Sequence, residues 1–194
     1  MTGTTAARIA SEARVVVVAE GSAAVSMRRL ATAVGVTPMA IYRHYPNREA
    51  LLAAVADAAF AELAEQWEGR VWADDQDLES HVAEVVGDHL DLALGTPRLY
   101  SFLFTERRDK ARRFPEDFQA GRSPTLNLLA AMLTEGIRRG LLRECDVWEV
   151  ALVLAATIHG LVQLYDGGRI ALPEPEFRGL CEAAVWRILD GITA

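Results

Sequence analysis

The chain has 194 residues, of which 51% are hydrophobic, and its 20 basic and 27 acidic side chains give a net charge of −7. This length fits one domain, or a small module joined to a larger one, and the apolar share is enough for a buried core. Alanine and leucine dominate and no alternating Val/Thr-rich stretch persists, so the composition favours an all-α fold over a sheet protein.

The charge is spread unevenly along the chain. The first 50 residues hold six arginines and three glutamates, whereas the remainder holds 14 basic and 24 acidic side chains. A basic end of an acidic protein can bind a polyanion, although an excess of three charges also fits ordinary variation. The uneven charge therefore indicates binding to a polyanion only if a structural motif supports it as well.

Several other functions find no support in the sequence. Cys145 and Cys181 have no metal-binding or redox spacing, so neither a metal site nor a cofactor is predicted. The N-terminus lacks the pattern of a signal peptide. The apolar run Val150–Ile158 is shorter than the roughly 20 residues of a membrane span. The expectation is a soluble, cytoplasmic protein without a membrane partner.

The first predicted helix covers residues 5–20, after an expected disordered start at residues 1–4. The run Val15–Val18 favours a strand locally, but the apolar residues before it recur at helical spacing. Gly21 is expected to end this helix.

Two short helices joined by a glycine are predicted within residues 26–51. Ser26 is a candidate N-cap for the first of them, and Gly35 supplies the positive φ of a sharp turn. Thr37 then caps the second helix, with Pro38 at its first position, where the missing N–H costs nothing.

These two helices are expected to cross closely at a steep angle. Ala31 is small and lies four residues before the glycine, and Ile41 would fill the space between the helices. Pro46 ends the second helix, and Asn47 caps a third that runs to about Glu68.

Helical periodicity continues to the end of the chain, interrupted by a loop at 69–76 and a mobile or frayed connection at 107–123. Asp146 and Glu149 have the spacing of a capping box. The later helices are predicted over residues 77–94, 99–104, 124–139 and 147–165, and over a C-terminal segment with the apolar stripe Phe177, Leu180, Cys181, Ala184, Val185, Ile188 and Ile192.

Two helices around a glycine turn fit a helix-turn-helix, whose second helix enters the major groove of DNA. Thr37 can donate and accept hydrogen bonds, and Pro38 and Met39 offer apolar contact to a thymine methyl group. Longer side chains with polar tips flank this segment and are suited to phosphates or bases. They are Arg28, Tyr42, Arg43, His44, Tyr45 and Arg48.

Each of these residues also has a purely structural interpretation, with Tyr42 and Tyr45 as core aromatics and His44 as a surface histidine. Their ordered combination is harder to obtain by chance. The segment LATAVGVTPMAIYRHYPNREALLAAV resembles the DNA-binding signature of the tetracycline-repressor (TetR) family of bacterial transcriptional regulators over about residues 8–55. Arg48 stands where lysine is usual, which keeps the charge but changes the geometry.

The resemblance implies an all-helical fold of about nine helices, a homodimer and a ligand-binding core. It also implies that residues 1–50 are a three-helix DNA-binding domain and that residues 51–194 bind the effector and dimerise. Base or phosphate contacts are implied for Arg28, Thr37, Pro38, Met39, Tyr42, His44 and Arg48. Beyond the first quarter of the chain the resemblance gives only architecture.

Candidate effector residues are polar or aromatic groups on otherwise apolar helices. His159 and Gln163 are four residues apart, so they share a helix face and either meet a ligand or pair across a dimer. A core role is the alternative for each candidate. The full set is His81, His89, Tyr100, Phe104, Asn127, Met132, Trp148, His159 and Gln163.

The leading prediction is a ligand-responsive regulator, a repressor, that binds a palindromic double-stranded DNA operator as a homodimer and is released by a small hydrophobic or aromatic effector. A helical enzyme is the rival, but no nucleophile–base spacing, metal cluster or phosphate loop supports it. A binding or scaffold protein without a DNA role is a third possibility. The basic cluster at 107–113 is interleaved with acidic residues and is interpreted as a solvated face.

Overall fold

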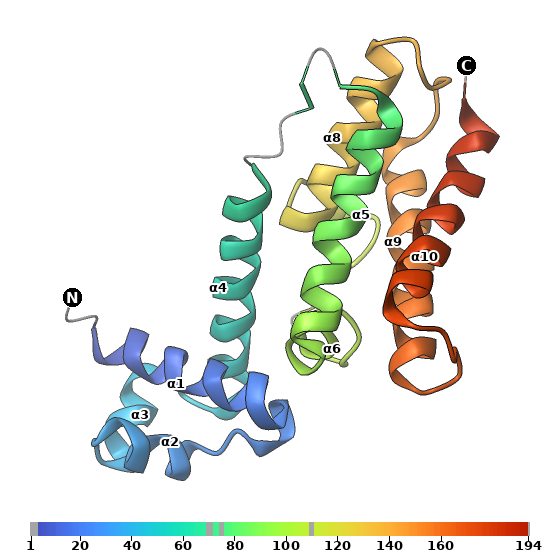
Figure 1. Ribbon diagram of the computed structural model, residues 1–194. Coiled ribbons are helices and arrows are strands. Elements are labelled where there is room, and N and C mark those ends of the chain that lie inside the picture. The colour runs from blue at the N-terminus through green and yellow to red at the C-terminus, as the bar shows by residue number, and fades with distance from the viewer. Residues whose placement is uncertain (1–3, 69–71, 74–75, 109–110, 194) are drawn as a thin grey trace. The chain divides into compact units, whose positions relative to one another are not determined.

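The computed structural model describes residues 4–68, 72–73, 76–108 and 111–193, and within them it confirms the predicted all-α fold (Figure 1). Two compact units are formed, one from the described parts of residues 1–62 and 96–110 and the other from those of 63–95 and 111–194. The α-helices are α1 (Thr5–Glu20), α2 (Met27–Val34), α3 (Pro38–His44), α4 (Arg48–Glu68), α5 (Leu78–Gly95), α6 (Pro97–Phe104), α7 (Glu116–Gln119), α8 (Pro124–Arg138), α9 (Val147–Asp166) and α10 (Glu174–Leu189).

The first unit contains α1, α2, α3, α6 and most of α4. Helix α1 includes the four valines of Val15–Val18 and ends at Gly21, whose φ of 90° suits glycine. The valines are accommodated because Val16 and Val17 are buried, so tertiary packing overrides local strand preference. A short 3₁₀ turn, Ser22–Ala24, then leads into α2.

The core of the first unit joins its helices through fully buried aliphatic side chains. Ile9 of α1, Leu30 of α2, Ile41 of α3 and Leu51 of α4 are each 0% exposed. Residues from four different helices thus share one small core, which fixes α2 and α3 against α1. Helix α3 is therefore held in place by this core.

The second unit contains α5, α7, α8, α9 and α10, with the last residues of α4. In Figure 1 the long helices α5, α8, α9 and α10 of this unit run alongside one another. Helix α9 contacts both α8 and α10, and α10 also contacts α5. Phe177 is fully buried and stacks on Tyr165 with ring centroids 4.0 Å apart, which fastens α10 to α9.

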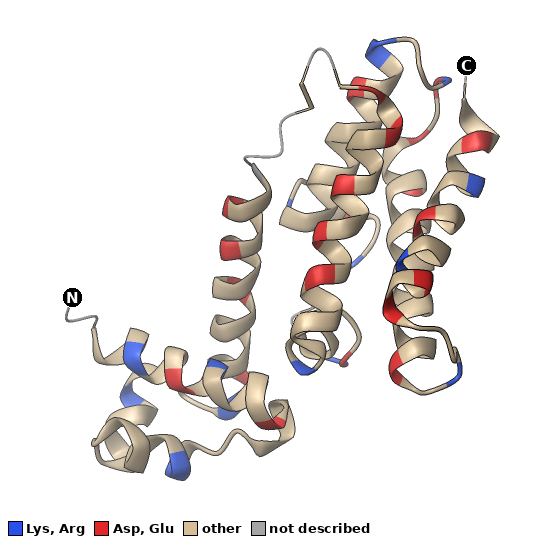
Figure 2. Ribbon diagram, viewed as in Figure 1, with Lys and Arg blue, Asp and Glu red and all other residues tan. Residues whose placement is uncertain are grey.

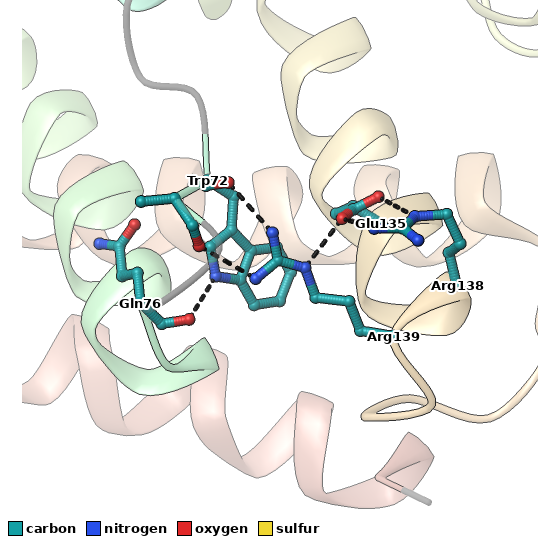
Figure 3. A network of polar contacts seen from close by, with 6 residues as sticks. Trp72, Gln76, Glu135, Arg138 and Arg139 are labelled. Carbon is teal, nitrogen blue, oxygen red and sulfur yellow. Dashed lines mark hydrogen bonds and ion pairs between the residues drawn. The ribbon is translucent and has the colours of Figure 1, made fainter.

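Trp72 anchors the segment between α4 and α5 to α8 (Figure 3). Its indole stacks on His81 at 4.9 Å, and the Arg139 guanidinium lies over its ring at 4.4 Å. The indole N–H donates to the carbonyl of Gln76 at 2.9 Å. Gly136 permits this packing, because a Cβ there would lie 2.7 Å from Leu142 Cδ1 and 3.7 Å from the Trp72 ring.

Arg139 is itself held in place by α8. Its guanidinium donates to Glu135 at 2.8 Å and to the Trp72 carbonyl at 3.1 Å, and Arg138 donates to the same glutamate (Figure 3). The two guanidinium groups lower the pKa of Glu135 to about 2, chiefly through their hydrogen bonds. Glu135 therefore stays ionised at neutral pH and keeps Arg139 on the indole.

The predicted helix ends agree closely with the structure. Asn47 accepts from Ala50 N at 2.7 Å, and Asp146 accepts from Trp148 N at 3.0 Å and from Glu149 N at 3.1 Å. Ser26 precedes α2 as predicted, but its side chain makes no capping bond. The short helix α7 lies inside the connection predicted as mobile or frayed.

Three sequence predictions fall wholly or partly outside the described residues. These are the disorder of residues 1–4, of which only Thr4 is described, the loop at 69–76 and part of the connection at 107–123. The division at residue 50 remains a prediction. Helix α9 is long and apolar enough to cross a membrane by length and composition, a property that the core helix of a soluble protein shares.

Candidate nucleic-acid interface

The turn between α2 and α3 has the geometry that the sequence predicts. Gly35 adopts a left-handed conformation with φ of 75°, and the N–H of Val36 donates to the carbonyl of Ala31 at 2.9 Å. Thr37 caps α3 by accepting from Ala40 N at 3.2 Å, with Pro38 at the first position. Ala31 and Ile41 are buried at the crossing.

One face of α3 is strongly exposed. Met39 is 68% exposed and Tyr42 is 48% exposed, which is unusual for large side chains with apolar groups. Thr37, Pro38, Arg43 and His44 are also exposed, as is Arg28 of α2. The structure thus brings seven of the nine predicted DNA-contacting residues to the surface of these two short helices.

Arginines in the first unit fall into two groups. Arg29 pairs with Glu20, and Arg8 donates to the carbonyl of Val34 at 2.8 Å, so both serve the fold. Among the described residues, Arg28 and Arg43 make no ion pair, and their charge is available to an external anion. Acidic residues instead recur along α5 in the second unit (Figure 2).

Two predicted DNA contacts instead bind within the protein. The Tyr45 hydroxyl donates to the carbonyl of Ala6 at 3.1 Å. The Arg48 guanidinium donates to the carbonyls of Val25, at 3.0 Å, and Ser22. Because these donors are engaged with backbone oxygens, we leave Tyr45 and Arg48 out of the proposed contact set and assign them to positioning α3.

Replacing Arg48 is therefore expected to lower stability. The Arg48→Ala variant leaves two carbonyls in the segment before α2 without their charged donor, and we expect a loss of about 2 kcal/mol in the free energy of unfolding. Arg48→Lys should recover only part of it, because an ammonium group cannot fork between two acceptors. Urea unfolding measures both. Wild-type stability in Arg48→Ala would restore Arg48 as a phosphate ligand.

The predicted effector residues are distributed over both units. Tyr100 and Phe104 belong to α6 in the first unit, where their rings lie 5.0 Å apart and Phe104 meets Phe60 edge-on at 5.5 Å. Tyr100 is 1% exposed, so in the first unit it is part of a packed aromatic cluster.

Four further candidates lie in the second unit but are not brought together. His81 is buried against Trp72, and burial lowers its pKa. Asn127 donates to the carbonyl of Gly121 at 2.7 Å, Met132 is buried in α8, and Trp148 is half-buried at the start of α9. His81 and Met132 therefore pack as core residues.

Two of the candidates, His89 of α5 and His159 of α9, meet within the second unit. Their ring centroids are 5.2 Å apart, and Trp67 of α4 lies 6.0 Å from His89. Gln163 is exposed and His159 is half-buried, and the shared ligand role of these two residues stays a prediction. The contact between His89 and His159 could not be predicted from the sequence, because 70 positions separate the two histidines.

Family models match both parts of the chain. Residues 9–55 match the model described as bacterial regulatory proteins of the tetR family, and residues 82–187 match a tetracyclin repressor-like C-terminal domain. The chain belongs to the tetR family. The resemblance of residues 8–55 to that family's DNA-binding signature is thereby confirmed, and the match extends through the helices of the second unit.

Solved structures have the same fold as this tetR-family chain. A protein of unknown function from Rhodococcus sp. RHA1 is 24% identical, with coverage of 100% of this chain and 97% of that one and a TM-score of 0.79. FadR from Bacillus subtilis, solved in complex with stearoyl-CoA, is 21% identical, with coverage of 96% and 98% and a TM-score of 0.73. A TetR regulator from Haloarcula marismortui is 18% identical, with coverage of 98% of both chains and a TM-score of 0.72. No curated protein matches the chain significantly.

Membership of the tetR family establishes the general function. The chain is a ligand-responsive, DNA-binding transcriptional regulator, and its helix-turn-helix is the element that the family uses on DNA. The rival prediction of a helical enzyme is not favoured. The family match assigns no individual residue to DNA or to the effector.

Proposed function

We propose that the chain represses transcription as a cytoplasmic homodimer that binds a palindromic operator and leaves it on binding a small apolar effector. The exposed face of α3 is the main support for the proposal, because Met39, Tyr42 and Arg43 are all exposed on a helix that the buried core holds in place. Thr37, Pro38 and Met39 are assigned to base edges, and Tyr42, Arg43, His44 and Arg28 to phosphates or neighbouring bases.

The homodimer is supported by an exposed apolar face on α9. Val153 is 44% exposed and Leu164 is 40% exposed, and the exposed Ala156 and Gly160 lie between them at helical spacing. Gln163 lies on the same exposed face, which favours its predicted role across a dimer over a role in ligand binding. A second copy of this chain would cover the face by helix–helix packing.

A glutamate in this face should separate the subunits. The Val153→Glu variant would bury a charge at the proposed interface, so we expect a monomer in sedimentation at micromolar concentration where the wild type is a dimer. Val15→Glu on α1 is the matched control, because Val15 is 56% exposed and lies in the other unit. Equal sedimentation of the wild type and Val153→Glu would contradict this interface.

An apolar effector is supported by the second unit, whose helices bury mainly aliphatic and aromatic side chains. The FadR structure, a fold neighbour, was solved in complex with stearoyl-CoA, a ligand with a long apolar acyl chain on a polar coenzyme A group. Binding of the effector is expected to favour a state in which the two recognition helices no longer fit successive major grooves.

Selection from random duplexes tests the operator. The full-length protein should enrich an inverted repeat whose half-sites are about one helical turn apart, or a multiple of that distance. Binding should weaken steeply between low and moderate salt, because phosphate contacts release counterions. Enrichment of a single, non-repeated half-site, or of no sequence, would contradict the dimeric arrangement.

A further inference from the structure

The side chains in the first turn of α3 are mostly apolar. With its N-cap, this turn covers residues 37–40, and the Thr37 hydroxyl is the only polar side-chain group among these four described residues. The hydroxyl oxygen accepts from Ala40 N at 3.2 Å, so it is partly engaged in capping the helix. Pro38 has no backbone N–H, and Ala40 is half-buried. The side chains of this turn therefore offer a ligand one hydroxyl group and otherwise apolar atoms.

Met39 is the long side chain of this turn and points away from the protein. Its exposed fraction of 68% is the highest among the exposed large hydrophobic side chains of the described residues. The exposure does not come from a loosely packed helix, because Ile41 of the same helix is 0% exposed. An unbranched thioether with three rotatable bonds can adapt to the surface that it meets. Met39 is thus an apolar group presented outward from a fixed helix.

The major groove of DNA offers one apolar feature to such a group. Guanine presents two acceptors there, adenine an acceptor and a donor, cytosine a donor, and thymine an acceptor together with its C5 methyl group. Guanine is read best by Arg or Lys, adenine by Asn or Gln, and cytosine by Asp or Glu. None of these six residue types occurs at positions 37–40. The thymine methyl group is therefore the base feature that matches the chemistry of this turn.

We propose that Met39 determines the sequence specificity of α3 by packing against the C5 methyl group of a thymine in each half-site of the operator. The inference rests on the proposed function, since it names the base and the chemical group that the recognition helix reads. Discrimination then depends on a methyl group and not on hydrogen bonds. Uracil pairs as thymine does but lacks the methyl group, so it should be bound less tightly at this position.

Replacement of single thymines by uracil in the selected operator tests the inference with the full-length protein. Each replacement removes one methyl group and leaves the base pairing and the hydrogen-bonding groups unchanged. One position in each half-site should lower the affinity about fourfold, and about 15-fold when both half-sites are changed, which is the effect of one buried methyl group per half-site. Fluorescence anisotropy measures the affinity.

Cytosine at the same position provides a second measurement with the opposite direction. A cytosine–guanine pair there should weaken binding, and 5-methylcytosine should then raise the affinity about fourfold per half-site above that of cytosine, because it restores the methyl group alone. A hydrogen-bonding side chain would not distinguish these two bases, since their donor and acceptor groups are the same.

Variants of Met39 show whether this side chain makes the contact. Met39→Ala should bind the thymine and uracil operators with affinities within about twofold of each other, whereas Met39→Leu keeps an apolar tip and should still prefer thymine. Val15→Ala on α1 is the matched control, because Val15 is 56% exposed in the same unit, and it should behave as the wild type does. Met39→Ala removes an exposed side chain and should unfold at the wild-type temperature.

Three results would overturn the inference and leave the proposed function in place. They are a selected operator without a common thymine in its half-sites, equal affinity for thymine and uracil at every position, and a uracil effect that persists unchanged in Met39→Ala. In the last case the methyl group would act through the shape of the DNA or on another residue. If no operator is enriched, the proposed function fails, and the inference fails with it.

Discussion

Operator affinity is expected to fall about a hundredfold when Tyr42 and Arg43 are both replaced by alanine. Both side chains are exposed on α3, so their removal leaves no cavity, and contacts of this kind contribute roughly 1–3 kcal/mol each to DNA binding. Loss of the Arg43 charge should also reduce the slope of log affinity against log salt by about one. Fluorescence anisotropy over a salt series measures both quantities.

The control for this double variant is Arg169→Ala in the second unit, which removes an exposed arginine far along the sequence from the helix-turn-helix. It should bind the operator as the wild type does. Thermal unfolding of the double variant should also match the wild type. A double variant that is stable and binds the operator with unchanged affinity would contradict the assignment of the exposed face of α3 to DNA.

Replacing Trp72 by alanine should cause the largest loss of stability among the changes proposed for the second unit. The variant removes a 7% exposed indole together with its stack on His81, its contact with Arg139 and its hydrogen bond to Gln76. Removal of a buried tryptophan costs roughly 3–5 kcal/mol. The midpoint of thermal unfolding should fall by about 10 °C for a chain of this length.

Trp72→Phe separates the packing of the ring from its hydrogen bond. The phenyl ring can still stack between His81 and Arg139, whereas the donor to the Gln76 carbonyl is lost, so we expect a cost of about 1 kcal/mol. Equal stability of Trp72→Ala and the wild type would show that the segment between α4 and α5 is not fastened by this side chain.

The parts of the fold that local chemistry determines were predictable from the sequence. Gly35 permits the left-handed turn after α2, and Thr37 and Pro38 define the start of α3. Asn47 and Asp146 cap the helices that follow them. Each of these signals depends on residues within four positions of one another. Helical periodicity, read over longer windows, correctly predicted the other long helices.

Contacts between distant residues were not predictable in this way. Tyr45 reaches Ala6, and Arg48 reaches Ser22 and Val25, so polar tips that seemed free for DNA bind backbone carbonyls instead. A single sequence does not reveal such partners, because a tyrosine or arginine on a short helix has the same pattern whether it faces solvent or a carbonyl.

The candidate effector site shows the same limit. His89 and His159 were predicted separately, and their contact arises only when α5 and α9 pack within one unit. Tyr100 and Phe104, predicted for the same role, pack against each other in the other unit, where Phe104 also meets Phe60. Residue type alone indicated possible chemistry, but the grouping of residues depended on tertiary structure.

Hydroxyl-radical footprinting of the selected operator tests the central claim most directly, because it shows how the protein lies on DNA. We expect two symmetric protected segments. Methylation of guanine N7 within each half-site should block binding, because we propose that α3 enters the major groove. The Tyr42→Ala/Arg43→Ala variant should leave the operator unprotected at the same protein concentration. Protection confined to one segment, or interference only from the minor groove, would contradict the account.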